Sequence, residues 1–245
     1  MAEKLLGHLV QEFLLLWRYP AFTVPSIAYP LLLFLFFGLT VDEDRKITTL
    51  VSLSFCAFAL LGVVLFDFGI GFASRRGSPW ETYLRTLPVA PWVPMIARLV
   101  VAVPFGVLAM APVALTATLT GRLQLGAVQW LAAIGALFLG MVPFACLGVL
   151  LGYVCSSRSA GPVTTLIYLP LAYVGGIFQR PESLPHVVAT LSTWTPTRMW
   201  RNLLENVVFA TVPATSDLAG LVLYAVALGA LAVVAVRRSE LRSYA

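Results

Sequence analysis

The stretch "ITTLVSLSFCAFALLGVVLFDFGIGFA", residues 47–73, contains a single charged side chain, that of Asp67. An apolar helix needs about 20 residues to cross the hydrocarbon core of a bilayer, so this stretch is long enough to span a membrane. The rest of the chain has the same character, because 60% of its 245 residues are hydrophobic and 11% are charged. About a quarter of the residues of a soluble domain are charged. The composition therefore predicts an all-α integral membrane protein.

Working outward from this stretch, hydropathy predicts six membrane spans in one transmembrane domain covering residues 1–245. The predicted spans are 20–41, 47–73, 93–120, 128–155, 161–178 and 216–236. Six spans place both termini on one side of the membrane, and that side carries ten of the 16 lysines and arginines. Positive charge gathers in cytoplasmic loops, so both termini are predicted to be cytoplasmic.

The polar segment "RRGSPWETYLRTLP", residues 75–88, interrupts the apolar runs and predicts a short helix over 79–87. Ser78 and Glu81 have the spacing of a capping box with Pro79 at the first helical position, and Pro88 ends the helix. One face carries the side chains Trp80, Tyr83, Leu84 and Leu87. A helix this short is not stable alone, so it must dock, either on this chain's own membrane helices or on a cytoplasmic partner protein.

Two further segments are not predicted to cross the bilayer. Apolar residues recur at helical spacing over residues 3–18, which indicates an interfacial helix on the membrane surface within 1–19, or simply an amphipathic start to the first span. The insert 179–215 is predicted to form two short external helices rather than a folded loop. Pro185 and Pro196 stand where these helices would begin, and Thr195 is placed to cap the second. Their predicted apolar faces carry Val187, Leu191 and Trp194 in the first helix and Met199, Leu203 and Val207 in the second.

The polar and aromatic side chains within the spans are candidates for a transport pathway. Asp67 is an acid inside a span, where a carboxylate is costly and often functional; the alternative is a structural pairing with Arg75, Arg76 or Arg98. The candidate aromatic wall consists of Phe34, Phe55, Phe58, Tyr168 and Tyr173. Aromatic residues at helical spacing equally describe ordinary helix packing. Glycine pairs such as Gly148 and Gly152 predict close helix approach.

No pattern of catalytic or metal-binding residues is found in the sequence. It contains no P-loop and no H-E-x-x-H motif, and His8 and His186 have no metal-ligand spacing around them. The cysteines Cys56, Cys146 and Cys155 are predicted to be free thiols that act as small hydrophobic residues. We therefore expect no catalytic residue, no metal site, no cofactor and no nucleic-acid partner, and any energy for work must come from a partner or a gradient.

Taken together, these elements resemble the ABC-2 type permeases, the membrane subunits of ABC exporters. The segment "RRGSPWETYLRTLPVAPW" is similar to a family segment through Arg76, Gly77, Ser78, Glu81, Leu84, Leu87 and Pro88. The end of the fifth span and the insert match through Leu169, Pro170, Gly175, Gly176, Leu184, Pro185 and Pro196. The order of all elements along the chain is the stronger part of the resemblance.

The resemblance implies a role for each element. Residues 78–87 would be the coupling helix, seated in a groove of a separate cytoplasmic ABC ATPase that holds ATP and Mg. The predicted contact residues are Arg76, Gly77, Ser78, Trp80, Glu81, Tyr83, Leu84, Arg85 and Leu87. The helix within 1–19 would be the connecting helix on the membrane surface. Pro79 and Trp80 replace the small or polar residues usual there, which puts the shape of the partner groove in doubt.

The implied assembly holds two permeases and two ATPases in a bacterial or archaeal cell membrane. It would export an amphipathic or hydrophobic substrate, such as a drug, an antibiotic or a lipid, out of the cytoplasm or inner leaflet. One alternative is an ATP-independent channel or secondary transporter, although Asp67 alone is a poor proton relay. The other alternative is a membrane scaffold subunit that docks a cytoplasmic partner and transports nothing.

Overall fold

A computed structural model of the chain describes residues 20–41, 43–75, 92–178 and 185–243. The described residues contain helices and connecting turns but no strand, which confirms the predicted all-α fold. The predicted interfacial helix within 1–19 and the predicted short helix over 79–87 lie outside the described residues.

A helix is present in each of the six apolar stretches. These helices are α2 (Pro20–Leu33, continued by a π-helical turn at Phe34–Gly38), α3 (Arg45–Arg75), α5 (Trp92–Leu119), α6 (Ala127–Val154), α7 (Ala160–Val174) and α10 (Thr215–Ser243). The ends of α7 and α10 differ most from those of the predicted spans. Helix α7 stops before Gly175 and Gly176, and Gly176 has φ +74°, a left-handed conformation that glycine adopts readily. Helix α10 continues through Arg237 and Arg238 to Ser243.

Among the described residues, four stretches are long and apolar enough to cross a bilayer, namely Arg45–Arg75, Ala102–Leu119, Ala127–Val154 and Thr215–Ser239. The apolar helices Ser26–Gly38 and Ala160–Val174 are shorter. At 1.5 Å per residue α7 is about 22 Å long, which is less than the roughly 30 Å of the hydrocarbon core. The described part is therefore that of a multi-pass membrane protein, and the count of six crossings stays a prediction.

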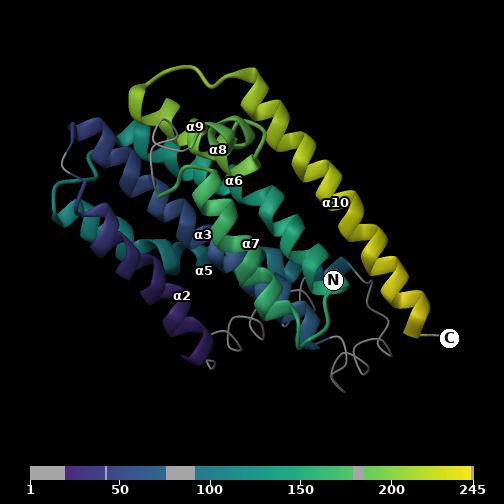
Figure 1. The fold of residues 1–245 in the computed structure, drawn as a ribbon. Helices are drawn as coiled ribbons and strands as arrows, with labels where there is room; N and C mark the ends of the chain where they lie inside the picture. Colours follow the sequence, from purple (N-terminus) through teal and green to yellow (C-terminus); the bar gives the residue numbers. More distant parts are fainter. Residues whose placement is uncertain (1–19, 42, 76–91, 179–184, 244–245) are drawn as a thin grey trace.

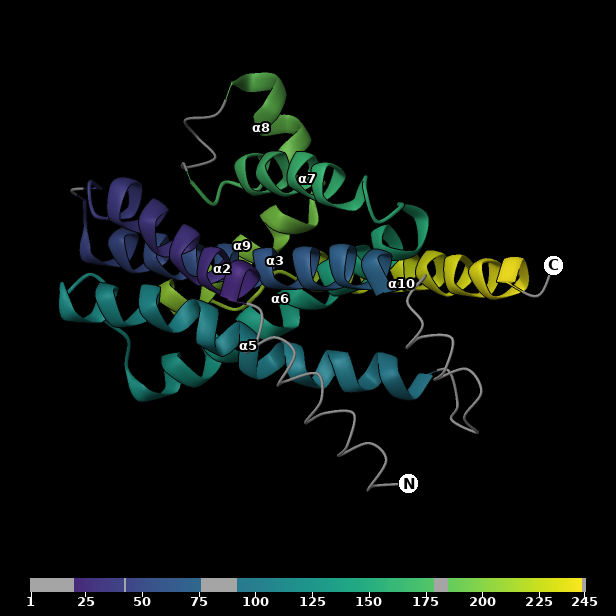
Figure 2. The same cartoon turned by 90° about the horizontal axis from the view of Figure 1, so that it is seen from below.

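Helix α3 is the central element of the bundle. It contacts α2, α5, α6, α7 and α9, and its side chains are mostly buried (Figures 1 and 2). Helix α10 lies along the outside of the bundle against α6 and α9, and many of its apolar side chains face outward (Figure 1). A displacement of α3 would therefore reach most of the other helices directly.

Helices α3 and α6 approach each other closely at the predicted glycine pair. A Cβ atom at Gly148 would lie 2.5 Å from the carbonyl oxygen of Val64, and one at Gly152 would lie 2.6 Å from the carbonyl oxygen of Phe68. Real Cβ atoms do not approach other atoms this closely, so any other residue at either position would force the two helices apart. The prediction that these glycines allow close helix packing is confirmed.

The insert before α10 forms two short helices, α8 (His186–Ser192) and α9 (Pro196–Phe209), as predicted. The hydroxyl of Thr195 accepts a hydrogen bond from the Arg198 amide at 3.3 Å, which confirms the predicted cap. The apolar face predicted for the first helix points away from the bundle. Its side chains Val187, Leu191 and Trp194 are exposed by 70%, 61% and 73%.

The apolar face of α9 is turned by about one residue from the predicted one. Trp200, Leu203, Leu204 and Val208 are buried, whereas the predicted Met199 and Val207 are only half-buried. The Trp200 indole determines this rotation. It donates a hydrogen bond to the Ala136 carbonyl at 3.0 Å, stacks on Phe144, and lies so close to Gly140 that a Cβ there would be 1.9 Å from the ring.

Hydrogen bonds join α8 and the turn that follows it to α7 and α10. The Ser192 hydroxyl donates to the Val174 carbonyl at 2.6 Å, at the carbonyl end of α7, where no helical partner remains. The Tyr224 hydroxyl of α10 donates to the Trp194 carbonyl at 2.6 Å. These contacts hold α8 and α9 across one end of the bundle (Figure 1).

Candidate functional site

The predicted contact residues for a partner ATPase lie outside the described residues, but the helices on both sides of them are described. Helix α3 ends at Arg75, and α5 begins at Trp92. These two ends lie at the same end of the bundle as the last turns of α10 (Figure 2). Because α3 and α5 also contact each other, residues 76–91 connect two packed helices at that end.

Four of the five aromatic residues predicted to form a pathway wall are buried in the core. Phe34, Phe55 and Phe58 are 0% exposed and Tyr168 is 2% exposed. The Phe58 and Tyr168 rings stack with centroids 4.6 Å apart, and the Phe34 and Phe55 rings meet edge to face at 5.5 Å. The Tyr168 hydroxyl donates to the Phe58 carbonyl at 3.1 Å. In this conformation these rings join α2, α3 and α7 as packing residues.

The remaining pathway candidates are more accessible. Tyr173 on α7 is 37% exposed. Asp67 on α3 is half-buried and interacts with its surroundings. Neither Asp67 nor Tyr173 lines the pocket at the start of α3 that is described below, and a pathway role for both residues stays a prediction.

Replacing Tyr168 by phenylalanine is expected to destabilise the chain by about 1 kcal/mol, because one buried hydrogen bond is lost while the ring stack on Phe58 remains. The measurement is thermal unfolding of purified protein in detergent, where the midpoint should fall by about 2–4 °C. Tyr173→Phe on the same helix is the matched control and should leave the midpoint unchanged. A Tyr168→Phe midpoint equal to that of the control would contradict the assigned hydrogen bond.

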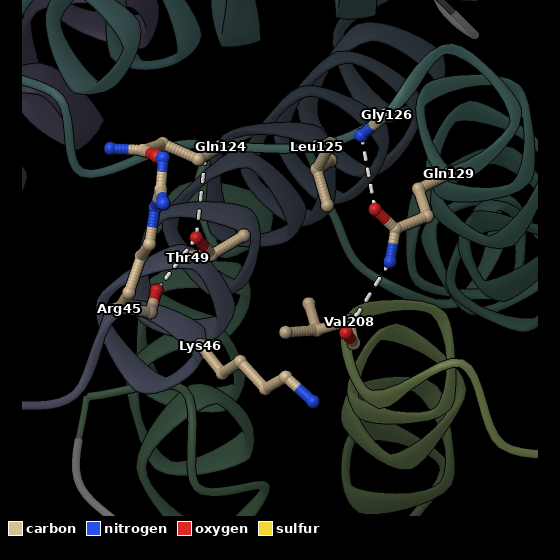
Figure 3. Close-up of a pocket in the computed structure, with 8 residues that line it drawn as sticks. All are labelled: Arg45, Lys46, Thr49, Gln124, Leu125, Gly126, Gln129 and Val208. Carbon is tan, nitrogen blue, oxygen red and sulfur yellow. Dashed lines mark hydrogen bonds between the residues drawn. The ribbon is translucent and has the colours of Figure 1, made fainter.

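A pocket that sequence reasoning did not predict lies at the other end of the bundle, with a volume of about 400 Å³ (Figure 3). Four segments that are distant in the sequence form its walls. The first turns of α3 supply Arg45, Lys46 and Thr49, the connection between α5 and α6 supplies Gln124, Leu125 and Gly126, α6 supplies Gln129, and α9 supplies Val208. Its volume falls within the roughly 300–1,000 Å³ usual for small-molecule sites.

Hydrogen bonds fix the walls of this pocket (Figure 3). The buried Thr49 hydroxyl lies 2.8 Å from the Arg45 carbonyl oxygen and accepts from the Gln124 amide at 3.3 Å. The Gln129 side chain accepts from the Gly126 amide at 3.0 Å and donates to the Val207 carbonyl at 3.2 Å. The three walls made by α3, the α5–α6 connection and α9 are therefore tied together.

The pocket is electropositive and partly apolar. Its lining contains two cations, Arg45 and Lys46, and no carboxylate. The ammonium of Lys46 also lies 5.2 Å from the centroid of the Phe209 ring, within cation–π range. Leu125 and Val208 supply the apolar part of the wall. Such a lining suits an anionic group attached to an apolar body.

The described residues hold no cluster of three or more His, Cys, Asp or Glu side chains that would bind a metal ion. The three cysteines are free thiols, as predicted.

Comparison with known proteins supports the predicted family. The sequence profile of the ABC-2 type transporter family matches residues 5–209, a range that includes α2 to α9 and the connection between α3 and α5. "Putative transport permease YvfS" of Bacillus subtilis (strain 168) is 22% identical over 179 residues, which cover 71% of this chain and 73% of that relative. Because the profile covers more than half of the chain, the resemblance predicted from the sequence is confirmed, and this membrane protein belongs to the ABC-2 type transporter family.

Proposed function

We propose that this chain is the permease subunit of an ATP-driven exporter and that a separate ATPase subunit supplies the energy. The observation that carries the proposal is the family match over residues 5–209, which includes the polar segment between α3 and α5. The chain itself contains no P-loop, so the proposed ATP and Mg are bound by the partner. The proposed working unit has two permeases and two ATPases.

The proposed coupling begins at the segment between α3 and α5. ATP binding brings the two partner ATPases together, and each ATPase moves the coupling helix over residues 78–87 that sits in its groove. The described packing supports transmission from there, because α3 ends just before this segment and contacts five other α-helices. The glycine seam at Gly148 and Gly152 holds α3 against α6 without intervening side chains. The α3–α6 pair would therefore tilt as one unit and carry α9 with it.

The proposed pathway lies between two permease copies, and the substrate is amphipathic or hydrophobic. The single chain exposes large apolar side chains on α2 and its π-helical turn, with Phe36 and Phe37 exposed by 67% and 57%. Leu166 and Tyr173 on α7 are also exposed. These surfaces suit contact with lipid, a second copy or an apolar substrate. The proposed direction is outward, with both termini in the cytoplasm.

Two other functions predict different behaviour of the same protein. A channel or secondary transporter would move substrate without ATP or a second subunit. A scaffold subunit would bind a cytoplasmic partner and move nothing. Among the described helices, Asp67 is a half-buried acid within an apolar span, and one carboxylate does not make a proton relay across a bilayer.

The decisive experiment is reconstitution with an ABC ATPase from the same genome, beginning with the adjacent reading frame. The two subunits are expected to copurify, and the complex should hydrolyse ATP in lipid vesicles and take fluorescent amphipathic dyes into inside-out vesicles. The matched control is an ATPase subunit whose catalytic glutamate is replaced by glutamine, which should assemble but not transport. Equal dye uptake with and without ATP would indicate a channel or secondary transporter instead. Copurification without any transport would indicate a scaffold subunit.

A further inference from the structure

We infer that the pocket between the start of α3, the α5–α6 connection and the end of α9 binds a phosphate-class anion, such as the headgroup of an anionic phospholipid. This site is separate from the predicted ATPase contact, because the pocket lies at the opposite end of α3 from Arg75. It does not depend on the exporter proposal, since binding to the purified chain needs neither ATP nor a partner.

The first argument is the arrangement of charge. Arg45 extends toward Gln124, and Lys46 extends toward α9, so the two cations border the pocket on different sides (Figure 3). Both side chains are exposed, and the ion pair found among the described residues, Arg201–Glu205, involves neither of them. A guanidinium and an ammonium each form charge-assisted hydrogen bonds with phosphate oxygens. The side-chain amide of Gln124 donates one N–H to the Gly121 carbonyl at 2.6 Å, and its second N–H is a neutral donor at the same rim.

The second argument is the position and polarity of the pocket. It is formed where α3 and α6 begin and where α9 ends, at the end of apolar helices, and this is the depth at which lipid headgroups lie. Leu125 and Val208 form an apolar wall beside the cations. A bare anion needs no such wall, whereas a headgroup that carries an apolar body does. The combination therefore favours an amphipathic anion.

The third argument is that the pocket is held in shape before any ligand binds. The Thr49 hydroxyl joins α3 to the α5–α6 connection, and the Gln129 side chain joins that connection to α9. Thr49 is 1% exposed, so its hydrogen bonds form the floor of the pocket rather than its rim. A ligand would therefore pay little to order the walls. Both cations lie outside this hydrogen-bonded frame and can be replaced without breaking it.

The test is a binding titration of the purified full-length protein in detergent by microscale thermophoresis. Three probes are used, namely dihexanoyl phosphatidylglycerol, dihexanoyl phosphatidylcholine and inorganic phosphate. The variant is Arg45→Gln with Lys46→Gln. Each cation near an anionic lipid contributes roughly a fivefold factor in affinity, so the dissociation constant for phosphatidylglycerol should rise about 30-fold. Arg237→Gln with Arg238→Gln removes the same charge from exposed positions on α10 and should leave the dissociation constant unchanged.

The probes distinguish the two sources of the anion. Saturable binding of phosphatidylglycerol that the Arg45/Lys46 variant loses identifies a lipid headgroup site, and equal behaviour of inorganic phosphate identifies a site for free phosphate groups. If none of the three probes binds, this result overturns the inference. So does binding that survives in the Arg45/Lys46 variant, or binding that falls equally in the Arg237/Arg238 control. Unfolding midpoints of both variants are measured alongside, and we expect them to match the wild type because these side chains are exposed.

Discussion

The double variant Glu81→Ala with Leu84→Ala is expected to lose its ATPase partner and to abolish ATP-dependent transport. In the predicted helix over 79–87, Leu84 belongs to the apolar face, and Glu81 completes the capping box with Ser78. A buried apolar anchor at an interface contributes about 2 kcal/mol or more, and losing the cap adds to this. The apparent dissociation constant of the complex should therefore rise by at least about 30-fold.

The readouts are copurification of the ATPase and ATP-dependent dye uptake in vesicles. Thr82→Ala is the matched control, because Thr82 lies on the opposite face of the predicted helix, and this variant should assemble and transport as the wild type does. Unchanged expression, membrane insertion and unfolding midpoint of the free permease would assign the loss to the partner contact. A lower unfolding midpoint of the free double variant would instead show that the segment docks on this chain's own helices. Normal transport by the double variant would refute the coupling role.

The helices were predictable from the sequence because hydropathy alone separates lipid-spanning stretches from their polar connections. Residues 47–73 illustrate this, since their single charge leaves α3 as the natural centre of a bundle. The capped start of α9 was predictable for a local reason as well, because Thr195 and Pro196 act on the adjacent backbone. These features depend on neighbours in the chain.

The orientation of α9 depends on tertiary contacts instead, and so does whether the aromatic residues line a pathway or pack in the core. Trp200 is buried because Gly140, 60 residues earlier, leaves space for its indole and Ala136 offers a carbonyl. Helical periodicity contains no information about that space, so the predicted face was rotated. Phe55 and Tyr168 fit a ligand wall and a packed core equally well by spacing. Only the structure shows that both are buried, with Tyr168 stacked on Phe58 and Phe55 edge to face with Phe34.

The electropositive pocket was missed for a similar reason. From the sequence, Arg45 and Lys46 are simply two of the basic loop residues whose distribution predicts the orientation of the chain in the membrane. Their relation to Gln124 and Gln129 arises when the first turns of α3 meet the α5–α6 connection and α9. The polar residues at the start of α3 and in the α5–α6 connection are visible in the sequence. Nothing in the sequence indicates that these two segments lie next to each other.

The variant Gly148→Leu is expected to prevent stable folding of the transmembrane bundle. Even the first carbon of a side chain would lie 2.5 Å from the Val64 carbonyl oxygen and 3.0 Å from the Phe68 Cβ. The Val64 oxygen belongs to the backbone of a buried helix, so it cannot rotate away as a side chain would. Overpacking of a well-packed core costs about 1–3 kcal/mol, and a backbone clash between two central helices falls at or above the upper end of this range. The yield of monodisperse protein in detergent should fall sharply.

Gly135→Leu on the same helix is the control for this experiment, because a Cβ atom at Gly135 meets no other atom within 4 Å. It should fold normally and gain a few tenths of a kcal/mol or more from the higher helix propensity of leucine. If Gly148→Leu fails to fold while Gly135→Leu on the same helix folds normally, the loss is due to the α3–α6 contact and not to a general effect of leucine. If Gly148→Leu folded as well as Gly135→Leu, α3 and α6 would have to be farther apart than the structure places them.

The intermediate variant Gly148→Ala extends this argument from stability to coupling. It adds only the Cβ atom that lies 2.5 Å from the Val64 oxygen, so α3 and α6 must separate slightly rather than fail to pack. If the two helices move as one unit during transport, this separation should lower ATP-driven transport while ATPase association, which depends on the segment after α3, remains intact. Thermal unfolding measures stability, copurification measures ATPase association, and dye uptake measures transport. Unchanged transport by a destabilised Gly148→Ala protein would show that the seam supports the fold but does not transmit the motion.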